Sequence, residues 1–330
     1  MKQFRWFIIL ALFLFTLSIT QNLNAQPAPQ DRITAPVDTR QTIARPGNRH
    51  PLALSEYDAG PVSPDHRMGR MMLVLQPDPA QQRALESLLA AQQDPQSPEY
   101  HRWLTPEEFG KRFGVSDHDL AQVVQWLERQ GFEVEAPSAG RRVVVFSGNA
   151  GQVEAAFHTS IHTYNVNGTT HHANSSDPRI PAALAPVVLG VASLHDFRSK
   201  PLHHGLRALE ASDPEYTSGS THYLTPADFA AIYDVNALYS SSIDGTGQSI
   251  AIVGRTNFSP ADISNFRSTF GLPANPPSLV LNGANPGIVS SAEQSEAQLD
   301  IEWSGAVAKN ATIKFVLSAS TGTTDGALLS

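Results

Sequence analysis

The order of apolar and polar positions divides this chain into two halves with different element patterns. In the first half, a short apolar strand at residues 71–75 precedes an Ala- and Leu-rich helix that is expected to run to about Gln92. Apolar residues then recur at helical spacing over residues 117–130 and stop at Gly131. This pattern predicts another helix, with a glycine directly after its end.

Between these two helices, the sequence carries the signature of a capped helix start. Thr105 is expected to be the N-cap, Pro106 the first helical residue and Glu108 the partner in a capping box. A third, short helix is therefore predicted to begin at Pro106.

The end of the first half predicts a hairpin and one further strand. Two apolar runs, residues 132–135 and 142–146, flank a turn that contains proline and glycine. A short helix at residues 149–157 and a strand at residues 161–166 follow. The order strand, helix, hairpin, helix, strand predicts a ferredoxin-like α+β sandwich for residues 70–197.

The second half alternates strands with helices. A continuous apolar strand of the buried parallel type is followed by a capped helix, and the alternation then repeats. Residues 222–330 are therefore predicted to begin an α/β domain with a parallel sheet. The expected strands are residues 249–253, 278–281 and 311–317, and the expected helices are residues 259–270 and 292–308.

Three further segments complete the expected organisation. Basic residues, the apolar run 6–17 and a polar stretch ending at Ala25 predict a secretory signal peptide over residues 1–25. We therefore expect a secreted, extracellular protein. Residues 26–69, rich in Pro, Gln, Thr and Ala, are expected to be a flexible leader. Residues 198–221 are interpreted as an exposed linker and the place of maturation cleavage.

Composition narrows the function classes. The sequence has no cysteine, which excludes thiol catalysis and cysteine zinc sites. Its net charge of −8 argues against binding nucleic acid, and no apolar run after the signal peptide is long enough to span a membrane. A monomer without nucleic acid or membrane partners is expected.

The most informative candidate chemistry is a pair of carboxylates on the predicted helix 292–308. Glu296 and Asp300 are four residues apart, so they project from the same face of that helix. Two like charges in a partly dry site should raise one of their pKa values, which suits a general base that works in acid. An ordinary exposed helix with acidic residues is the alternative interpretation of this spacing alone.

The sequence around this pair resembles the sedolisin family of serine-carboxyl peptidases, and most closely its kumamolisin-like members. The first half carries motifs similar to the family's activation prodomain, and the second half carries motifs similar to the opening of the mature enzyme. These motifs are YHRWLTPEEF (residues 100–109), FG (113–114), YLTPADF (223–229), YDV (233–235), DGTGQSIAIV (244–253) and FRSTFGLP (266–273).

The resemblance implies a subtilisin-like fold in which glutamate replaces histidine as the base that activates a serine. Glu296 and Asp300 fall where the family carries its acidic catalytic pair, and the substrates would be proteins or peptides. The prodomain would bind its own catalytic domain. The family's serine lies in a Gly-Thr-Ser segment further along, which is not found before Ser330. The chain is therefore expected to be truncated and inactive as given, with the family's calcium site also beyond residue 330.

A hypothesis from a different class stays open beside the peptidase precursor. The chain could be a non-enzymatic, prodomain-type inhibitor or folding chaperone of a peptidase. Glu293 and Glu302 are interpreted as structural residues on other faces of the helix from Glu296, and Trp303 is expected to pack rather than to line a substrate pocket. The many histidines of the first half match no zinc spacing, and they are either solvated surface residues or sensors of falling pH.

Overall fold

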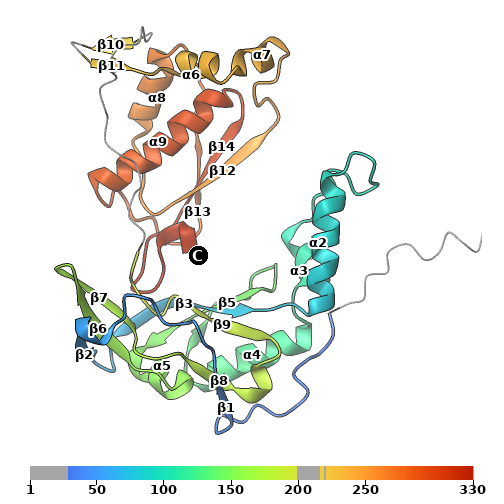
Figure 1. Ribbon diagram of the computed structural model, residues 1–330, viewed down its shortest axis with the longest axis vertical. Coiled ribbons are helices and arrows are strands. Elements are labelled where there is room, and N and C mark those ends of the chain that lie inside the picture. The colour runs from blue at the N-terminus through green and yellow to red at the C-terminus, as the bar shows by residue number, and fades with distance from the viewer. Residues whose placement is uncertain (1–28, 199–215, 219–220, 330) are drawn as a thin grey trace, which may run out of the picture.

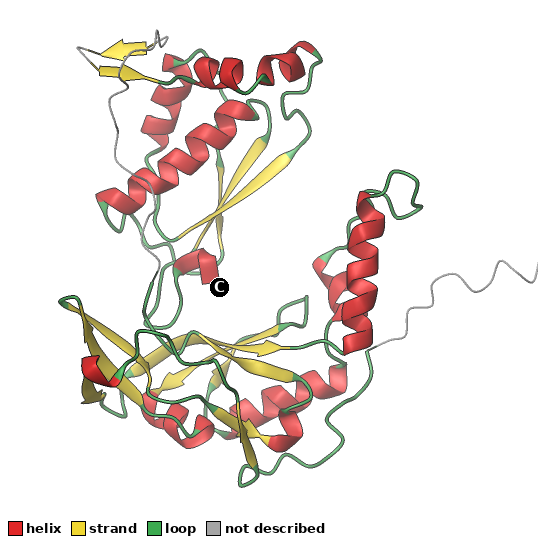
Figure 2. Cartoon of the chain, viewed as in Figure 1, coloured by secondary structure: helices red, strands yellow, loops and turns green. Residues whose placement is uncertain are grey.

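The computed structural model describes residues 29–198, 216–218 and 221–329, and it shows a mixed α/β protein with several sheets (Figures 1 and 2). One part, residues 29–198, is built on antiparallel sheets. The other, residues 221–329, is built on a parallel sheet. The predicted signal peptide and most of the predicted linker lie outside the described residues.

The main sheet of the first part has four antiparallel strands in the order β4-β5-β3-β9. Buried side chains of this sheet pack against buried residues of two helices, and Trp126 meets the ring of Phe157 edge-on at 5.3 Å. The strands are β3 (Arg67–Leu75), β4 (Glu133–Val134), β5 (Val143–Asn149) and β9 (Val188–Ala192), and the two helices are α4 (Asp117–Arg129) and α5 (Ala150–Phe157).

The predicted hairpin is confirmed, because β4 pairs with β5 and Val134 lies opposite Phe146. The final strand of the predicted order is different. The strand predicted at residues 161–166 exists as β6 (Ile161–Val166), but it belongs to a second sheet, with β2 (Asp58–Pro61) and β7 (Thr169–Asn174). The fourth strand of the main sheet is β9, which pairs with β3.

Residues 29–69, expected to belong to a flexible leader, contribute strands and core side chains. β1 (Thr42–Ala44) pairs with β8 (Arg179–Pro181), and Ile33 is buried in the main core. The fully buried carboxylate of Asp119 accepts hydrogen bonds from the backbone of Arg32 and Ile33 at 2.9 Å. Composition alone missed this packing, because its partners lie more than 80 residues further along the chain.

The predicted helix starts are confirmed, including the capping box at Thr105. The Thr105 hydroxyl accepts from the backbone of Glu108, and the Glu108 carboxylate accepts from the backbone of Thr105. The remaining helices of the first part are α2 (Pro79–Gln93), α3 (Pro106–Phe113), and two short 3₁₀ turns, η1 (Ser55–Tyr57) and η2 (Ala182–Leu184).

The second part has the predicted alternation of strands and helices and a fully parallel sheet in the order β12-β14-β13. Its helix α9 runs along the sheet beside α8 (Figure 1). The elements are β12 (Ser249–Gly254), α8 (Pro260–Thr269), β13 (Ser278–Leu281), α9 (Ser291–Val307) and β14 (Thr312–Leu317), preceded by β10 (Tyr216–Ser218), β11 (Thr221–Tyr223), α6 (Pro226–Ile232) and α7 (Val235–Ser240) and followed by η3 (Gly326–Leu329).

The two parts meet where the loop after β14 contacts β3. The Thr321 hydroxyl donates to the carbonyl of Gly69 at 2.8 Å, and the Thr323 hydroxyl bonds to the same carbonyl. Beside them, the Arg70 guanidinium donates to the Asn282 carbonyl at 3.2 Å. The β3 ladder changes register between Met68 and Met71, so a bulge places this carbonyl and guanidinium against the second part.

Candidate active site

The predicted carboxylate pair lies on α9, the longest helix of the second part. The Ser290 hydroxyl caps this helix by accepting from the backbone of Glu293 at 3.2 Å. Ala297 and Ile301 are buried on its inner face, against the core of the parallel sheet. Glu296 and Asp300 each precede one of these buried residues, so both lie at the border between the buried face and solvent.

The two carboxylates of the pair influence each other. Glu296 is partly buried, whereas Asp300 is more exposed. The pKa of the Asp300 carboxyl is nevertheless raised above its ordinary value, first because nearby protein displaces water from it and second because of the negative charge of Glu296. Asp300 therefore keeps its proton to a higher pH than an isolated aspartate does.

The first turn of α9 is fixed by an ion cluster that the sequence did not reveal. Arg255, just after the carboxyl end of β12, donates from Nε and Nη2 to the two oxygens of Glu293 at 2.8 and 2.6 Å. Its Nη1 bonds to Asp325 in the segment after β14. All three side chains are largely buried, and the pKa of Arg255 is raised well above its ordinary value, mainly by the bond to Glu293.

Glu293 lies three residues before Glu296 on α9, so it neighbours that residue on the helix surface rather than pointing elsewhere. Its ion pair supports the structural role expected for it. The only sequence signal for Arg255 was its place at the carboxyl end of a parallel strand, the edge where sites form in open α/β sheets.

The other residues singled out on α9 belong to its packing. Burial, and then the charge of Asp262 on α8, raise the pKa of Glu302 to about 7. The ring of Trp303 packs between α6 and α8, with its centroid 5.8 Å from that of Phe229 and 6.5 Å from that of Phe266. The packing role expected for Trp303 agrees with these contacts.

The described residues contain neither a metal-binding group of side chains nor a membrane-spanning helix. Nowhere in this part of the chain do three or more His, Asp or Glu side chains form a group that could hold a metal ion. Over the same residues, every helix is too short or too polar to cross a membrane.

Comparison with known proteins adds to this geometry. Residues 56–197 match the family model described as "Pro-kumamolisin, activation domain". The chain is 30% identical over 197 residues to xanthomonalisin of Xanthomonas sp. (strain T-22), covering 57% of this chain and 23% of that protein. It is 26% identical over 279 residues to sedolisin of Pseudomonas sp. (strain 101), covering 83% and 45%. It is 27% identical over 286 residues to kumamolisin of Bacillus sp. (strain MN-32), covering 84% and 49%. The chain thus spans half or less of the length of these curated relatives.

Proposed function

We propose that the chain belongs to the sedolisin family of peptidase precursors and carries the activation prodomain and the acidic catalytic pair of a secreted endopeptidase that works in acid. One observation supports the site above all others. A helix packed on the parallel sheet presents Glu296 and Asp300 one turn apart, with their charges coupled.

The pair would supply the base for peptide hydrolysis. The raised pKa of Asp300 favours the protonated form of that carboxyl in acid, and Glu296 would be the member of the pair that acts as the base. Glu296 would then take the proton of a serine hydroxyl as its oxygen attacks the peptide carbonyl, and would later return that proton to the leaving amine. A histidine base would be protonated and inactive under the same conditions.

The serine is supplied in this family by a Gly-Thr-Ser segment, which these 330 residues do not contain. The described chain alone is therefore expected to hydrolyse nothing, because a base without a nucleophile forms no acyl-enzyme. The calcium ion expected from the family resemblance has no part in the steps assigned to these residues.

The fold supports the assignment of one prodomain and one catalytic domain. The antiparallel order β4-β5-β3-β9, with helices between its strands, is consistent with a ferredoxin-like prodomain over residues 70–197. The parallel order β12-β14-β13 is consistent with the start of a subtilisin-like domain over residues 222–330. The hydrogen bonds from Thr321 and Thr323 to Gly69 would be part of the interface between the prodomain and its own catalytic domain.

One observation favours the second candidate, a prodomain-type inhibitor or chaperone. The matching family model covers residues 56–197 and describes an activation domain, not a peptidase. Such a protein would bind a peptidase of this family without cleaving peptides itself.

The two functions are separated by acidifying the complete secreted product of the gene at about pH 4. The peptidase precursor should be cut within residues 198–221 and should then hydrolyse a protein substrate. A product that stays uncut, hydrolyses nothing and slows a sedolisin-type peptidase would instead establish the inhibitor.

A further inference from the structure

Five histidines gather around one carboxylate at the end of the first part, directly before the segment that leads to the second part. They come from four separate segments, and three of them contact Phe197, which packs against the small core formed by Ala53, Tyr164, Val166 and Ala173. This group, called the histidine cluster below, consists of His50, His66, His171, His172 and His195 around Asp196.

Asp196 holds the centre of the cluster at the edge of β7. Its carboxylate accepts from the backbone N–H of His172 at 2.8 Å and lies 3.1 Å from Nδ1 of the same residue. It also lies 3.3 Å from Nδ1 of His171. Consecutive residues of a strand point to opposite faces, so this carboxylate joins imidazoles on both faces of the sheet.

The remaining imidazoles are packed against these two. On one face, the rings of His50 and His171 stack on Phe197 with centroids 4.1 and 4.2 Å away. On the other, the ring centroid of His66 lies 4.6 Å from that of His172. These contacts place His66 directly against His172, and they place His50 and His171 against the same phenyl ring.

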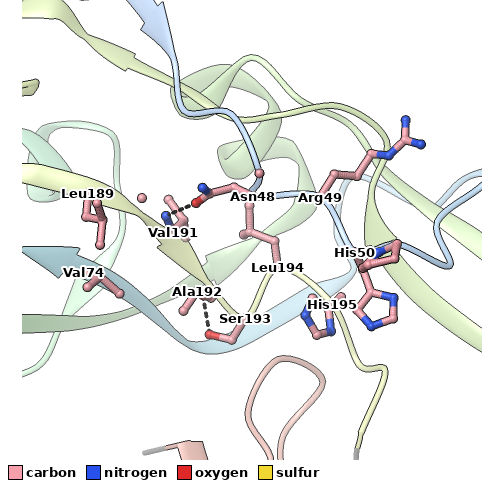
Figure 3. A pocket seen from close by; sticks show the side chains of 13 residues that line it. Asn48, Arg49, His50, Val74, Leu189, Val191, Ala192, Ser193, Leu194 and His195 are labelled. Atoms are coloured by element: carbon pink, nitrogen blue, oxygen red, sulfur yellow. Dashed lines mark hydrogen bonds between the residues drawn. The ribbon is translucent and has the colours of Figure 1, made fainter.

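His195 is the most enclosed member. Its ring centroid lies 4.6 Å from that of His50, and its buried Nδ1 has no hydrogen-bond partner in the protein. Figure 3 shows the two rings next to each other beside a pocket of about 390 Å³, lined by residues 47–51 and 189–195. The backbone of Val191 donates to the Asn48 side chain at 2.8 Å, which ties the segment carrying His50 to β9.

Charged groups around the cluster do not add a second counter-ion. Asp58 on β2 is bonded to His162 on β6 at 2.9 Å, and Asp65, directly before His66, is exposed to solvent. Arg49 adds a positive charge and donates to the Ser175 carbonyl. Among the described residues, Asp196 is the carboxylate that bonds to these imidazoles.

The cluster is connected to the second part through the next residues of the chain. Arg198, two residues after Asp196, donates to the carbonyl of Thr321. Thr321 is the residue whose hydroxyl bonds to Gly69 of β3. Movement of the segment 195–198 would therefore disturb the loop through which the two parts touch.

We propose that the histidine cluster is an acid-operated release switch, in which proton uptake by its packed imidazoles loosens residues 45–54 and 193–198 and with them the contact between the two parts. One carboxylate cannot balance several imidazolium charges held at stacking distance, so the cluster opens to separate them. The loosening of these segments is inferred from the histidine cluster alone, whereas the release of a prodomain by this loosening rests on the proposed function.

The direction of the effect follows from proton linkage. Burial lowers the pKa of His50, of His66 and of His195, in each case helped by a neighbouring imidazole, and that of His195 falls to about 4. An unfolded histidine titrates near pH 6.5. Between these values the unfolded state binds more protons, so stability is present above about pH 6.5 and is lost as the pH falls toward 4.

The test compares the 330-residue chain with its His50→Gln/His195→Gln variant, and His118→Gln on α4 serves as the control outside the cluster. Amide exchange of residues 193–198 and 319–324 is followed from about pH 7 to pH 4.5 after correction for intrinsic rates. In the parent and in the control, protection of both segments should fall at least roughly tenfold more than in the double variant. Equal losses in all three proteins would overturn the proposal.

A measurement on the unmodified chain covers the case in which the double variant does not fold. NMR titration of the imidazole resonances should show His195 taking up its proton well below pH 6, together with loss of the folded signals of residues 45–54 and 193–198. An ordinary titration of His195 without structural change would also overturn the switch. Neither experiment uses peptidase activity, so an inactive gene product would refute the proposed function and leave the switch standing.

Discussion

Replacing Arg255 with methionine should destabilise the second part of the chain more than any change of a surface charge. The methionine keeps the apolar length of the side chain and removes its three bonds to Glu293 and Asp325. The side chains of Arg255, Glu293 and Asp325 are only 11, 17 and 13% exposed, so the substitution removes the cation that bonds to two largely buried carboxylates.

Breaking a buried ion pair in this way costs about 3–5 kcal/mol. Because these side chains keep some contact with water, we expect about 3 kcal/mol. The loss should be local, since Arg255 joins the end of β12 to the first turn of α9 and to the segment after β14. The assay is the free energy of opening from amide exchange of α9, with the thermal unfolding midpoint as a second readout.

The matched control is Arg67→Met, which removes an ion pair of the same short length. Arg67 lies 2.8 Å from Glu133, but their side chains are 63 and 74% exposed, and such pairs contribute about 0–1 kcal/mol. A loss below about 1 kcal/mol for Arg255→Met, or equal losses for both variants, would refute the assignment of this cluster as the anchor of α9.

Three further outcomes are expected. Asp119→Ala should detach residues 32–33 from α4 and cost about 3 kcal/mol, because a buried carboxylate with three backbone hydrogen bonds is lost; a thermal midpoint unchanged from the parent would contradict the packed leader. Glu302→Gln should stabilise the chain by about 1–2 kcal/mol at pH 8 and by almost nothing at pH 4. The folded pKa of the Glu302 carboxyl is raised to about 7, so this group makes the folded state less stable as the pH rises through that value. Urea titrations at both pH values measure the two gains, and an equal gain at both would contradict this prediction. Limited proteolysis should digest residues 221–329 before residues 29–198, because the apolar side chains of Val253, Leu279 and Leu281 on the parallel sheet are 45, 41 and 52% exposed. Equal protection of both parts would contradict this.

Local sequence signals predicted the helices and most strands. Asp78, Thr105, Asn149 and Ser259 each cap a helix close to where the pattern starts one, because capping depends on residues three positions apart. The period of the apolar positions likewise placed α9 and β14 to within a residue or so, and so placed Glu296 and Asp300 on one helical face.

Features that depend on distant partners were not predictable in the same way. β9 was missed as the fourth strand of the main sheet, because only its pairing with β3, more than 100 residues earlier, distinguishes it from β6. The leader was expected to be flexible, because its anchor, Asp119, lies in another element. Arg255 could not be matched to Glu293 and Asp325, which are 38 and 70 residues away.

Substitution in the complete gene product tests whether Glu296 is the general base of an acid-active peptidase. Hydrolysis of a protein substrate is measured at about pH 4 for the parent, for Glu296→Gln and for Glu302→Gln. Glu302 serves as the control because its carboxyl, with a pKa of about 7, is already protonated there and so resembles the amide. We expect a loss of at least roughly a hundredfold for Glu296→Gln and near-parental turnover for Glu302→Gln. Near-parental turnover of the Glu296→Gln protein would contradict it.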